Sequence, residues 1–507
     1  MLATLIGIVA AGCVGVAIVD GPSKRRSVFM AAAIILAGVL LAADQWNATQ
    51  VAELRGSPGL LAAVFVVGAA AIAATAWLIR RWPVLLPVLI LIALPFRIPL
   101  ELGGEEANLL VPLYLVMAGG VAATIWGRFT EAQPASWRVS PEPTGLARWL
   151  KPLLAASVVL YALAVLYSDD RSTGLQNLCF FLIPFATVFA LMDEVEWNMK
   201  TLRLILVVIV FEALACAFVG FIEWGTRSLL WNETVVETNN FHVYFRVNSL
   251  FWDPNIYGRY LALAITMVSA TLLWSRRSRE AWILAGVTVI LWVALLTTYS
   301  QSSFIALVAG LLVLAALKWS LKWVSVLIGA LAVGALCFAA FAGSTVKLDF
   351  GALNKQTSGR ADLVSGGVEL FGNRPVQGYG SGSFSVAFKD VIVKDDNAPV
   401  TESHTEPITI ASEQGLIGLL IYVLVIVASI FALTAGMRTV MPGLGAAFGS
   451  RDPSRGPPVA RAAVLAAFIA VLVHTVTYAG FLEDPITWVL IAIGYSLAFP
   501  CRATSAA

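Results

Sequence analysis

The sequence predicts an all-α fold, a polytopic transmembrane helical bundle of about 14 to 15 spans. Two observations lead to this prediction. Hydrophobic residues make up 59% of the 507 residues and charged residues only 13%, about half the charge of a typical soluble domain. The hydrophobic residues also form repeated blocks of about 17 to 23 residues, long enough to cross the roughly 30 Å hydrocarbon core of a bilayer. This composition excludes a soluble protein.

The first hydrophobic block starts at the N-terminus and is followed by the basic run Lys24-Arg25-Arg26. A secretory signal peptide has its basic residues before the apolar run, so this order indicates a first membrane helix. The fourth and the last of the blocks are weak. The expected spans are 1–19, 28–43, 60–79, 82–96, 109–126, 152–167, 174–192, 202–224, 255–274, 281–298, 303–317, 323–343, 412–434, 461–480 and 485–500.

Basic residues fall in alternate loops, and these loops are expected to be cytoplasmic. This rule places the N-terminus outside, the C-terminus inside, and two longer loops outside, 225–254 and 344–411. The net charge of +2 reflects this sorting by side, and nucleic acid is not an expected partner. Four regions are predicted: extra N-terminal transmembrane helices (1–80), a transmembrane core (81–343), a large extracytoplasmic loop (344–411) and C-terminal transmembrane helices (412–507).

The outer loop 344–411 is expected to be partly helical and to precede the third-last span. Its stretch from Arg360 to Phe371 has apolar residues on one side, as an amphipathic helix does. The run Gly378-Tyr379-Gly380-Ser381-Gly382 follows and predicts a turn, because no buried strand precedes it as in a nucleotide-binding motif. No ATP-binding motif occurs, so energy for a reaction must come from the substrate or from a gradient.

No metal site is expected. The five cysteines lie in or beside apolar segments without a CxxC spacing, which favours packing roles. The pair Asp169-Asp170 on an outer loop could hold a divalent metal, but no third ligand is evident and a solvated loop is favoured. Glu223 and His474 lie within spans and are interpreted as buried polar partners, and Glu212 is a further weak signal in the same span as Glu223.

His404 is one of only three histidines and lies where the large outer loop re-enters a hydrophobic helix. Thr405 is expected to cap this helix, and Pro407 suits its first turn. The positive end of the helix dipole favours a neutral imidazole, which suits a general base. The alternative is a histidine that only hydrogen-bonds the loop.

Three arginines lie on the side of the membrane that is normally poor in basic residues. Arg246 and Arg360 fall in the outer loops, where their charge and hydrogen-bonding fork suit phosphate. Ion pairs inside a folded loop are the alternative. Arg259 falls within a hydrophobic span, so it should either face a cavity or partner, or extend to the nearby membrane surface.

The sequence around these residues carries a recognisable pattern. His404-Thr405 is followed by nine residues and then by Gly415-Leu416-Ile417-Gly418. Ser358-Gly359-Arg360 and the segment from Asn373 to Gly380 precede it, and Arg246 to Asn255 lies earlier. Over about residues 150–500, these segments resemble the O-antigen ligase and polysaccharide polymerase superfamily of bacterial membrane glycosyltransferases, of GT-C type. Thr405 departs from the amide or serine that is usual at its position.

The resemblance implies a metal-independent, inverting transfer without a cofactor, at the outer face of the bacterial cytoplasmic membrane. The donor would be a glycan on undecaprenyl pyrophosphate, and the acceptor a sugar hydroxyl on a lipid, a protein or a growing chain. Arg246 and Arg360 would bind the pyrophosphate, and His404 would accept the acceptor proton or position that hydroxyl. The further residues expected to contact substrate are Asn255, Arg259, Arg374, Thr405 and Glu413.

Two other classes of function remain open from the sequence. A secondary transporter or lipid-linked glycan flippase would place polar residues near the middle of the bilayer, where only Glu212 and His474 are candidates. A non-catalytic scaffold or sensor would leave His404, Arg246 and Arg360 far apart.

Overall fold

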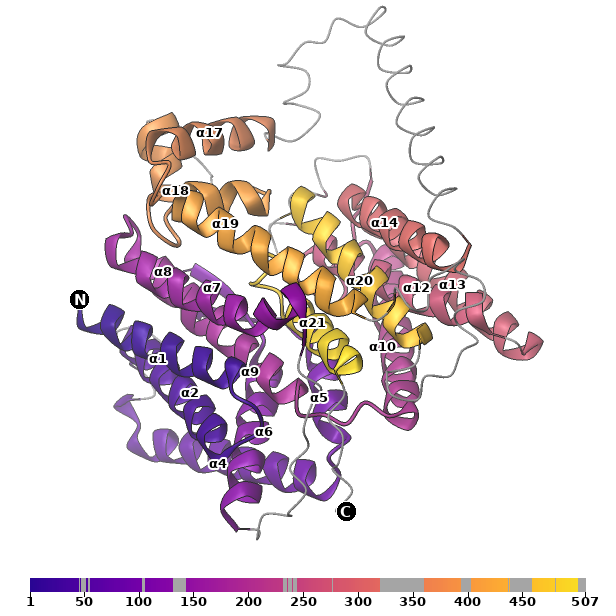
Figure 1. Ribbon diagram of the computed structural model, residues 1–507, viewed down its shortest axis with the longest axis horizontal. Coiled ribbons are helices and arrows are strands. Elements are labelled where there is room, and N and C mark those ends of the chain that lie inside the picture. Colours follow the sequence, from indigo (N-terminus) through magenta and orange to yellow (C-terminus); the bar gives the residue numbers. More distant parts are fainter. Residues whose placement is uncertain are drawn as a thin grey trace, which may run out of the picture.

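The computed structural model is a helical bundle (Figure 1). It describes residues 1–44, 46, 52, 55–102, 105–130, 143–230, 235, 239, 244–275, 277–319, 360–393, 403–435, 437, 458–478 and 480–499. The helices are α1 (Leu2–Val19), α2 (Lys24–Asp44), α4 (Pro58–Arg81), α5 (Leu85–Ala93), α6 (Val111–Thr130), α7 (Leu150–Ala164), α8 (Arg171–Asn177), α9 (Ile183–Met192), α10 (Met199–Thr226), α12 (Pro254–Trp274), α13 (Ser278–Thr298), α14 (Gln301–Lys318), α17 (Arg360–Asn373), α18 (Phe384–Ala387), α19 (Glu406–Thr434), α20 (Pro458–Thr477) and α21 (Pro485–Ala498).

The predicted polytopic helical bundle is confirmed. Within the described residues, 12 helices are long and apolar enough to cross a membrane. The two blocks that were weak in sequence give shorter helices: α5 has 9 residues and α21 has 14. The expected span 323–343 lies outside the described residues. Helices α8 and α9 form one span through a π-helical turn at Leu178–Leu182.

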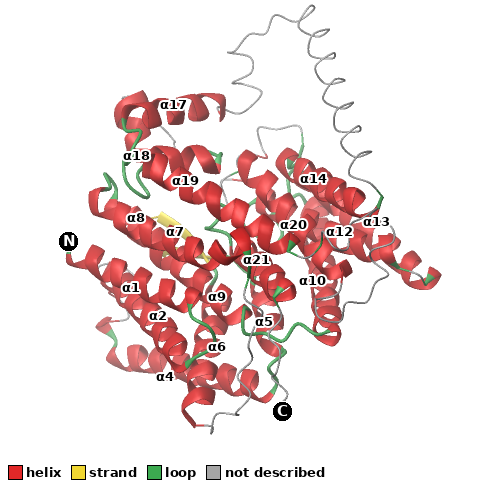
Figure 2. Ribbon diagram, viewed as in Figure 1, coloured by secondary structure: helices red, strands yellow, loops and turns green. Residues whose placement is uncertain are grey.

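One short antiparallel hairpin accompanies the helices, and the sequence did not predict it. Strands β1 (Ile98–Leu102) and β2 (Glu105–Leu109) pair between α5 and α6, with Ile98 opposite Leu109 (yellow in Figure 2). The hairpin lies at the predicted outer end of the bundle.

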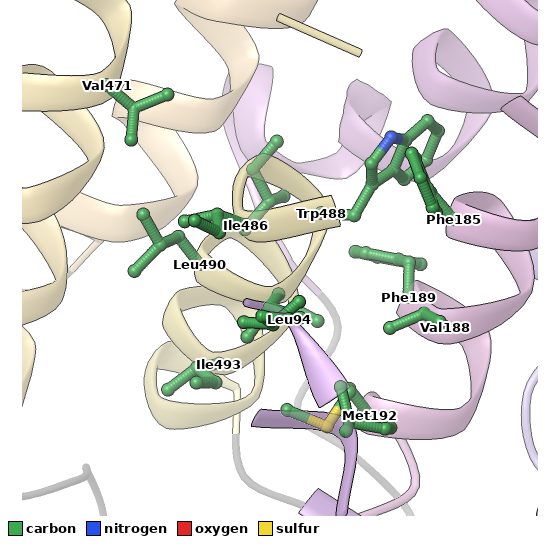
Figure 3. Close-up of a cluster of buried hydrophobic side chains, with 14 of the residues drawn as sticks. Leu94, Phe185, Val188, Phe189, Met192, Val471, Ile486, Trp488, Leu490 and Ile493 are labelled. Atoms are coloured by element: carbon green, nitrogen blue, oxygen red, sulfur yellow. The ribbon is translucent and has the colours of Figure 1, made fainter. Parts of the chain in front are cut away.

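Helix α21 is short because other helices surround it. All fourteen of its residues are buried. Trp488 meets Phe189 of α9 edge to face, with ring centroids 6.3 Å apart, and Figure 3 shows these rings within one apolar cluster. A helix enclosed by protein need not match the thickness of the bilayer, so hydropathy alone defined this segment poorly.

The helices expected as N-terminal additions pack directly on the core. Helix α1 lies along α7, and α2 contacts α6 and α9. The fully buried Arg26 of α2 pairs with Asp193 at 3.0 Å, and Lys151 pairs with the same carboxylate at 2.7 Å. Burial alone would raise the pKa of Asp193, but Lys151 and Arg26 together lower it below its ordinary value. This ionic cluster fixes α2 at the predicted cytoplasmic end.

Helices α17 and α18 lie together at one end of the bundle, over the start of α19 (Figure 1). Helix α17 confirms the predicted amphipathic helix in the large loop. It approaches α19 so closely that a Cβ on Gly367 would lie only 2.4 Å from Ile408 Cγ2. A small separate hydrophobic core holds α17 and α18 together, and it includes Leu370, Phe384 and Phe388.

Candidate active site

A polar cluster joins the ends of α12, α14 and α20. His474 near the end of α20 is fully buried, and its Nε2 lies 3.2 Å from Ser302 Oγ and 3.3 Å from Ser303 Oγ at the start of α14. Ser303 Oγ in turn donates a hydrogen bond to the Asn255 carbonyl oxygen at 3.2 Å. The prediction of His474 as a buried polar partner is confirmed.

Arg246 belongs to the same cluster. Its Nε donates to the Thr298 carbonyl oxygen at 3.0 Å, and one terminal nitrogen donates to Asn255 Oδ1 at 3.0 Å. These two bonds orient the guanidinium without neutralising it, since no ion pair of Arg246 occurs among the described residues. Asp253 is an acidic residue near Arg246 in the sequence. It caps α12 by accepting hydrogen bonds from the backbone N–H groups of Asn255 and Ile256.

His404 reaches this cluster through Tyr478. The His404 and Tyr478 rings stack with centroids 5.7 Å apart and an interplanar angle of 28°. Tyr478 also meets His474 edge to face at 5.7 Å. A continuous series of contacts therefore runs from His404 through Tyr478, His474, Ser303 and Asn255 to Arg246.

Arg259 has a buried partner, so it does not extend to the membrane surface. It pairs with Asp484 at 3.0 Å, and both side chains are only 3% exposed. Arg259 also lies 3.3 Å from the Gly480 carbonyl oxygen, while Gly480 N–H donates to Glu406 Oε2 at 2.7 Å. The loop between α20 and α21 thus connects Arg259 to the first residue of α19. Of the two interpretations drawn from sequence, the paired one is confirmed.

Arg97 also belongs to this cluster, although no sequence pattern marks it as a site residue. Arg97 precedes β1, and no ion pair involves it among the described residues. Burial and the neighbouring Arg259 lower the pKa of Arg97, while Asp484 and Tyr478 act in the opposite direction. Arg97 therefore lies near the Arg259–Asp484 ion pair and Tyr478.

Glu223 in α10 is a buried partner as expected, and Glu212 of the same helix is buried too. Glu212 accepts a hydrogen bond from Tyr260. Glu223 accepts from the backbone N–H groups of Asn248 and Ser249, at 3.2 and 2.8 Å. It therefore holds the loop that carries Arg246.

Helix α19 begins at Glu406, two residues after His404, whose φ of 55° is left-handed. Thr405 occupies the N-cap position, but its side chain makes no capping hydrogen bond. Ser403 shapes this turn instead, since its hydroxyl accepts from Thr405 N–H at 3.1 Å. The predicted position of the helix start is confirmed, and the predicted capping by the Thr405 side chain is wrong.

The glycine-rich turn 378–382 packs against α19. Gly378, Gly380 and Gly382 all have positive φ, which confirms the predicted turn. Tyr379 and Gly380 donate backbone hydrogen bonds to carbonyl oxygens of α19 at 2.9 and 2.7 Å. The Glu413 carboxylate accepts from the N–H groups of Gly382 and Phe384, at 3.0 and 3.1 Å. Glu413 therefore supports the turn, whatever its contact with substrate.

Arg374 and the aspartates of the 169–170 pair also have partners. Arg374 lies 3.4 Å from Asp169 and 4.1 Å above the centroid of the Tyr379 ring. Asp170 caps α8 by accepting from Thr173 N–H at 3.0 Å. No group of three His, Cys, Asp or Glu residues among the described residues is placed to hold a metal ion.

A cavity of about 660 Å³ lies beside the cluster. Residues of α7, α18, α19 and the loop after α20 line it, together with Asp170 ahead of α8. Glu406 belongs both to this lining and to the hydrogen bond with Gly480. The cavity therefore adjoins the arginine and histidine cluster.

Arg360 is the first residue of α17, but its side chain lies outside the described residues. The structure therefore joins Arg246, Asn255, Arg259 and His404 in one region and does not test the position of the Arg360 guanidinium. Tyr478, Asp484, Arg97 and Glu406 complete that region. In the sequence, the Asp484-Pro485 pair indicates a helix start with Asp484 as its cap. No feature of the sequence indicates that Asp484 forms an ion pair with Arg259.

Residues 286–423 match a family model described as O-antigen ligase. Over this segment the chain is similar to O-antigen ligases. The matched segment includes Arg360, His404 and Gly415, and it begins after Arg246 and Arg259. The family resemblance seen in the sequence is confirmed over a shorter range than the expected 150–500. Comparison with curated proteins finds no match.

The family and the bundle together describe a multi-pass membrane protein of a glycan-transferring, ligase or polymerase type.

The structure explains why the sequence pattern has a glycine at position 415. Gly415 interrupts α19 with φ 64° and ψ −159°, so the helix is kinked there. A Cβ at Gly415 would lie 2.2 Å from the Val376 carbonyl oxygen.

We expect Gly415→Ala to destabilise the protein by about 1–3 kcal/mol or more, because alanine is strained at positive φ and the added methyl group clashes with backbone. Thermal unfolding in nanodiscs measures this effect. The matched control is Gly286→Ala in α13, where a Cβ meets nothing within 4 Å. Equal unfolding temperatures for Gly415→Ala and wild type would contradict the role assigned to the kink.

Proposed function

We propose that this protein transfers a glycan from undecaprenyl pyrophosphate to a sugar hydroxyl at the outer face of the bacterial cytoplasmic membrane. The contact series from His404 to Arg246 carries the proposal, because it brings together an imidazole and a guanidinium that forms no ion pair with any described residue. Basic residues sort to the opposite end of the bundle, which supports the outer location.

In the proposed reaction, the acceptor oxygen forms a bond to the anomeric carbon of the donor glycan. The bond from that carbon to the pyrophosphate oxygen breaks with inversion, and the pyrophosphate keeps the electron pair. Arg246 and Arg360 stabilise the charge that develops on this leaving group, with Arg97 and Arg259 nearby. His404 takes the acceptor proton or holds the hydroxyl for attack. Asn255 orients Arg246, and we retain Arg374, Thr405 and Glu413 as substrate contacts.

The donor suits an enzyme without an ATP site, since a sugar pyrophosphate is already activated. We expect its polyprenyl tail to lie between helices in contact with membrane lipid. Whether the acceptor is a finished carrier or a growing chain distinguishes a ligase from a polymerase.

We expect glycan transfer by the full chain in proteoliposomes to persist in the presence of a chelator, because arginines and not a metal ion are proposed to stabilise the pyrophosphate. The measurement supplies a glycan-bearing undecaprenyl pyrophosphate and candidate acceptors, and it follows product by mass. In parallel, labelled donor reports movement across the bilayer. Movement of the donor without any transfer would overturn the proposal in favour of a flippase.

A further inference from the structure

A pair of stacked tyrosine rings lies on the surface beside Arg246. The rings of Tyr244 and Tyr299 have centroids 4.7 Å apart and an interplanar angle of 22°. Tyr244 is 41% exposed and Tyr299 is 47% exposed, so the pair keeps aromatic surface open after the two rings cover one another. The sorting of basic residues among the loops places this surface at the predicted outer end of the bundle.

The backbone of Tyr299 is strained for a residue with a large side chain. Tyr299 follows the last residue of α13 and has φ 50° and ψ 29°, in the left-handed region. Glycine is the usual residue at such a helix end, because a side chain there costs conformational energy. Packing does not account for a tyrosine at this position, since nearly half of the side chain is exposed. Strain of this kind is typical of positions where the side chain has a function.

The turn from Thr297 to Tyr299 holds the loop that carries Arg246 through three successive contacts. Its first carbonyl oxygen accepts a hydrogen bond from Val247 N–H at 3.3 Å, and its second accepts one from Arg246 Nε at 3.0 Å. The ring of its third residue stacks on Tyr244. The tyrosine pair therefore has a fixed position relative to the guanidinium that we propose for the pyrophosphate.

The connection below the pair is short and bonded to the buried polar cluster. Only Tyr299 and Ser300 separate α13 from α14. The buried Ser300 hydroxyl lies 2.8 Å from Ser303 Oγ, which belongs to the cluster around His474. A ring surface held in this way is preorganised, so little conformational entropy is lost when a ligand binds to it.

The chemistry of the pair selects the class of ligand. A pyranose presents axial C–H groups on one face and hydroxyl groups around its edge. The C–H face packs on an aromatic ring, whose face is electron-rich, and the phenol hydroxyls can exchange hydrogen bonds with the sugar hydroxyls. Single aromatic side chains also collect at membrane surfaces, but this pair is joined to the loop of the proposed leaving-group arginine. These features favour a saccharide over a lipid headgroup.

We propose that the Tyr244–Tyr299 pair is a stacking platform for a pyranose unit of the glycan substrates. The proposal rests on the transfer reaction proposed above and adds a position for sugar next to the leaving group at Arg246. The segment that matches the family model includes Tyr299 but not Tyr244. The sugar belongs to the donor or to the acceptor, and its C–H face makes the same contact in either case.

Saturation-transfer NMR on the full chain in nanodiscs tests the proposal. The probes are methyl β-glucoside and methyl β-galactoside, with glycerol as a polyol that has no ring. We expect the strongest signals from the axial C–H protons on one face of the glucoside, and none from glycerol.

Tyr299→Gly is the decisive variant, because glycine suits the left-handed backbone and removes the ring. Sugar binding should weaken about 10-fold, while the unfolding temperature equals that of wild type or rises. Tyr299→Phe keeps the ring and should keep sugar binding within about 3-fold of wild type. Tyr244→Leu, which changes no strained residue, should also weaken binding.

The matched control is Trp282→Ala, which removes an aromatic side chain that is 79% exposed at the other end of α13. This variant should keep sugar binding. Absence of signals from both glycosides, or equal binding by wild type and Tyr299→Gly, would overturn the proposal. A Tyr299→Gly protein that unfolds earlier and binds sugar as wild type does would overturn it in favour of a pair that anchors the protein at the membrane surface.

A second titration uses undecaprenyl pyrophosphate without glycan. If this lipid binds and the glycosides do not, the platform is wrong and the transfer proposal stands. If the glycosides bind and the lipid does not, the proposed donor is wrong and the platform stands. Steady-state transfer by Tyr299→Gly then separates the sources: a raised KM for acceptor places the acceptor sugar on the platform, and a raised KM for donor places the donor sugar there.

Discussion

Replacing His404 with alanine is expected to lower the rate of glycan transfer by about 10²–10⁴-fold, the usual contribution of a general base. Donor binding should persist, because the proposed pyrophosphate ligands are arginines. His404→Asn is the sharper variant. Asparagine tolerates the left-handed backbone found at this position and can hydrogen-bond, but it cannot take up a proton near neutral pH.

Steady-state kinetics and thermal unfolding of wild type, His404→Ala and His404→Asn check this prediction. We expect unchanged unfolding of His404→Asn together with lost transfer. An Asn variant that retains more than about a tenth of the wild-type rate would contradict proton transfer and leave His404 as a residue that only positions the hydroxyl.

Replacing Arg246 with alanine is expected to reduce transfer by about 10²–10³-fold, the effect of removing one preorganised donor to a developing charge. Arg246→Lys should recover little, since an ammonium cannot make the two orienting bonds and also present a fork to phosphate. The measurement is kcat and KM for donor in the purified protein.

Arg277→Ala is the control for loss of positive charge. Arg277 is 80% exposed and pairs only with Glu280 of its own helix among the described residues, at the predicted cytoplasmic end. Its replacement should leave transfer unchanged. Full activity of Arg246→Ala, or equal losses in both variants, would contradict a specific role of Arg246 at the leaving group.

The membrane-spanning helices were predictable because hydropathy depends on local sequence. Their direction across the membrane stays a prediction from the basic loops. The two helices that sequence placed poorly, α5 and α21, have 9 and 14 residues and are too short to span a bilayer by themselves. Protein surrounds α21 in particular, so neither its length nor its apolar face had to match a bilayer.

The candidate site was predictable only in part. His404 and Arg246 stood out as polar residues on one side of the membrane. Their connection depends on Tyr478 and on the buried His474, and the ion pair of Arg259 depends on Asp484. The contacts of His404 with Tyr478, of His474 with Ser303 and of Arg259 with Asp484 join segments more than 50 residues apart along the chain, and no local pattern encodes them. The kink at Gly415 was visible only as a glycine within a motif.

The most direct test of the account is the stoichiometry of transfer. Purified full-length protein, a glycan-bearing undecaprenyl pyrophosphate and an acceptor would be incubated, and both the new glycoside and the free undecaprenyl pyrophosphate would be counted by mass spectrometry. The account predicts one undecaprenyl pyrophosphate released for each glycan joined, with both products lost together in His404→Asn. Release without joining, or joining that survives the loss of His404 and Arg246, would contradict it.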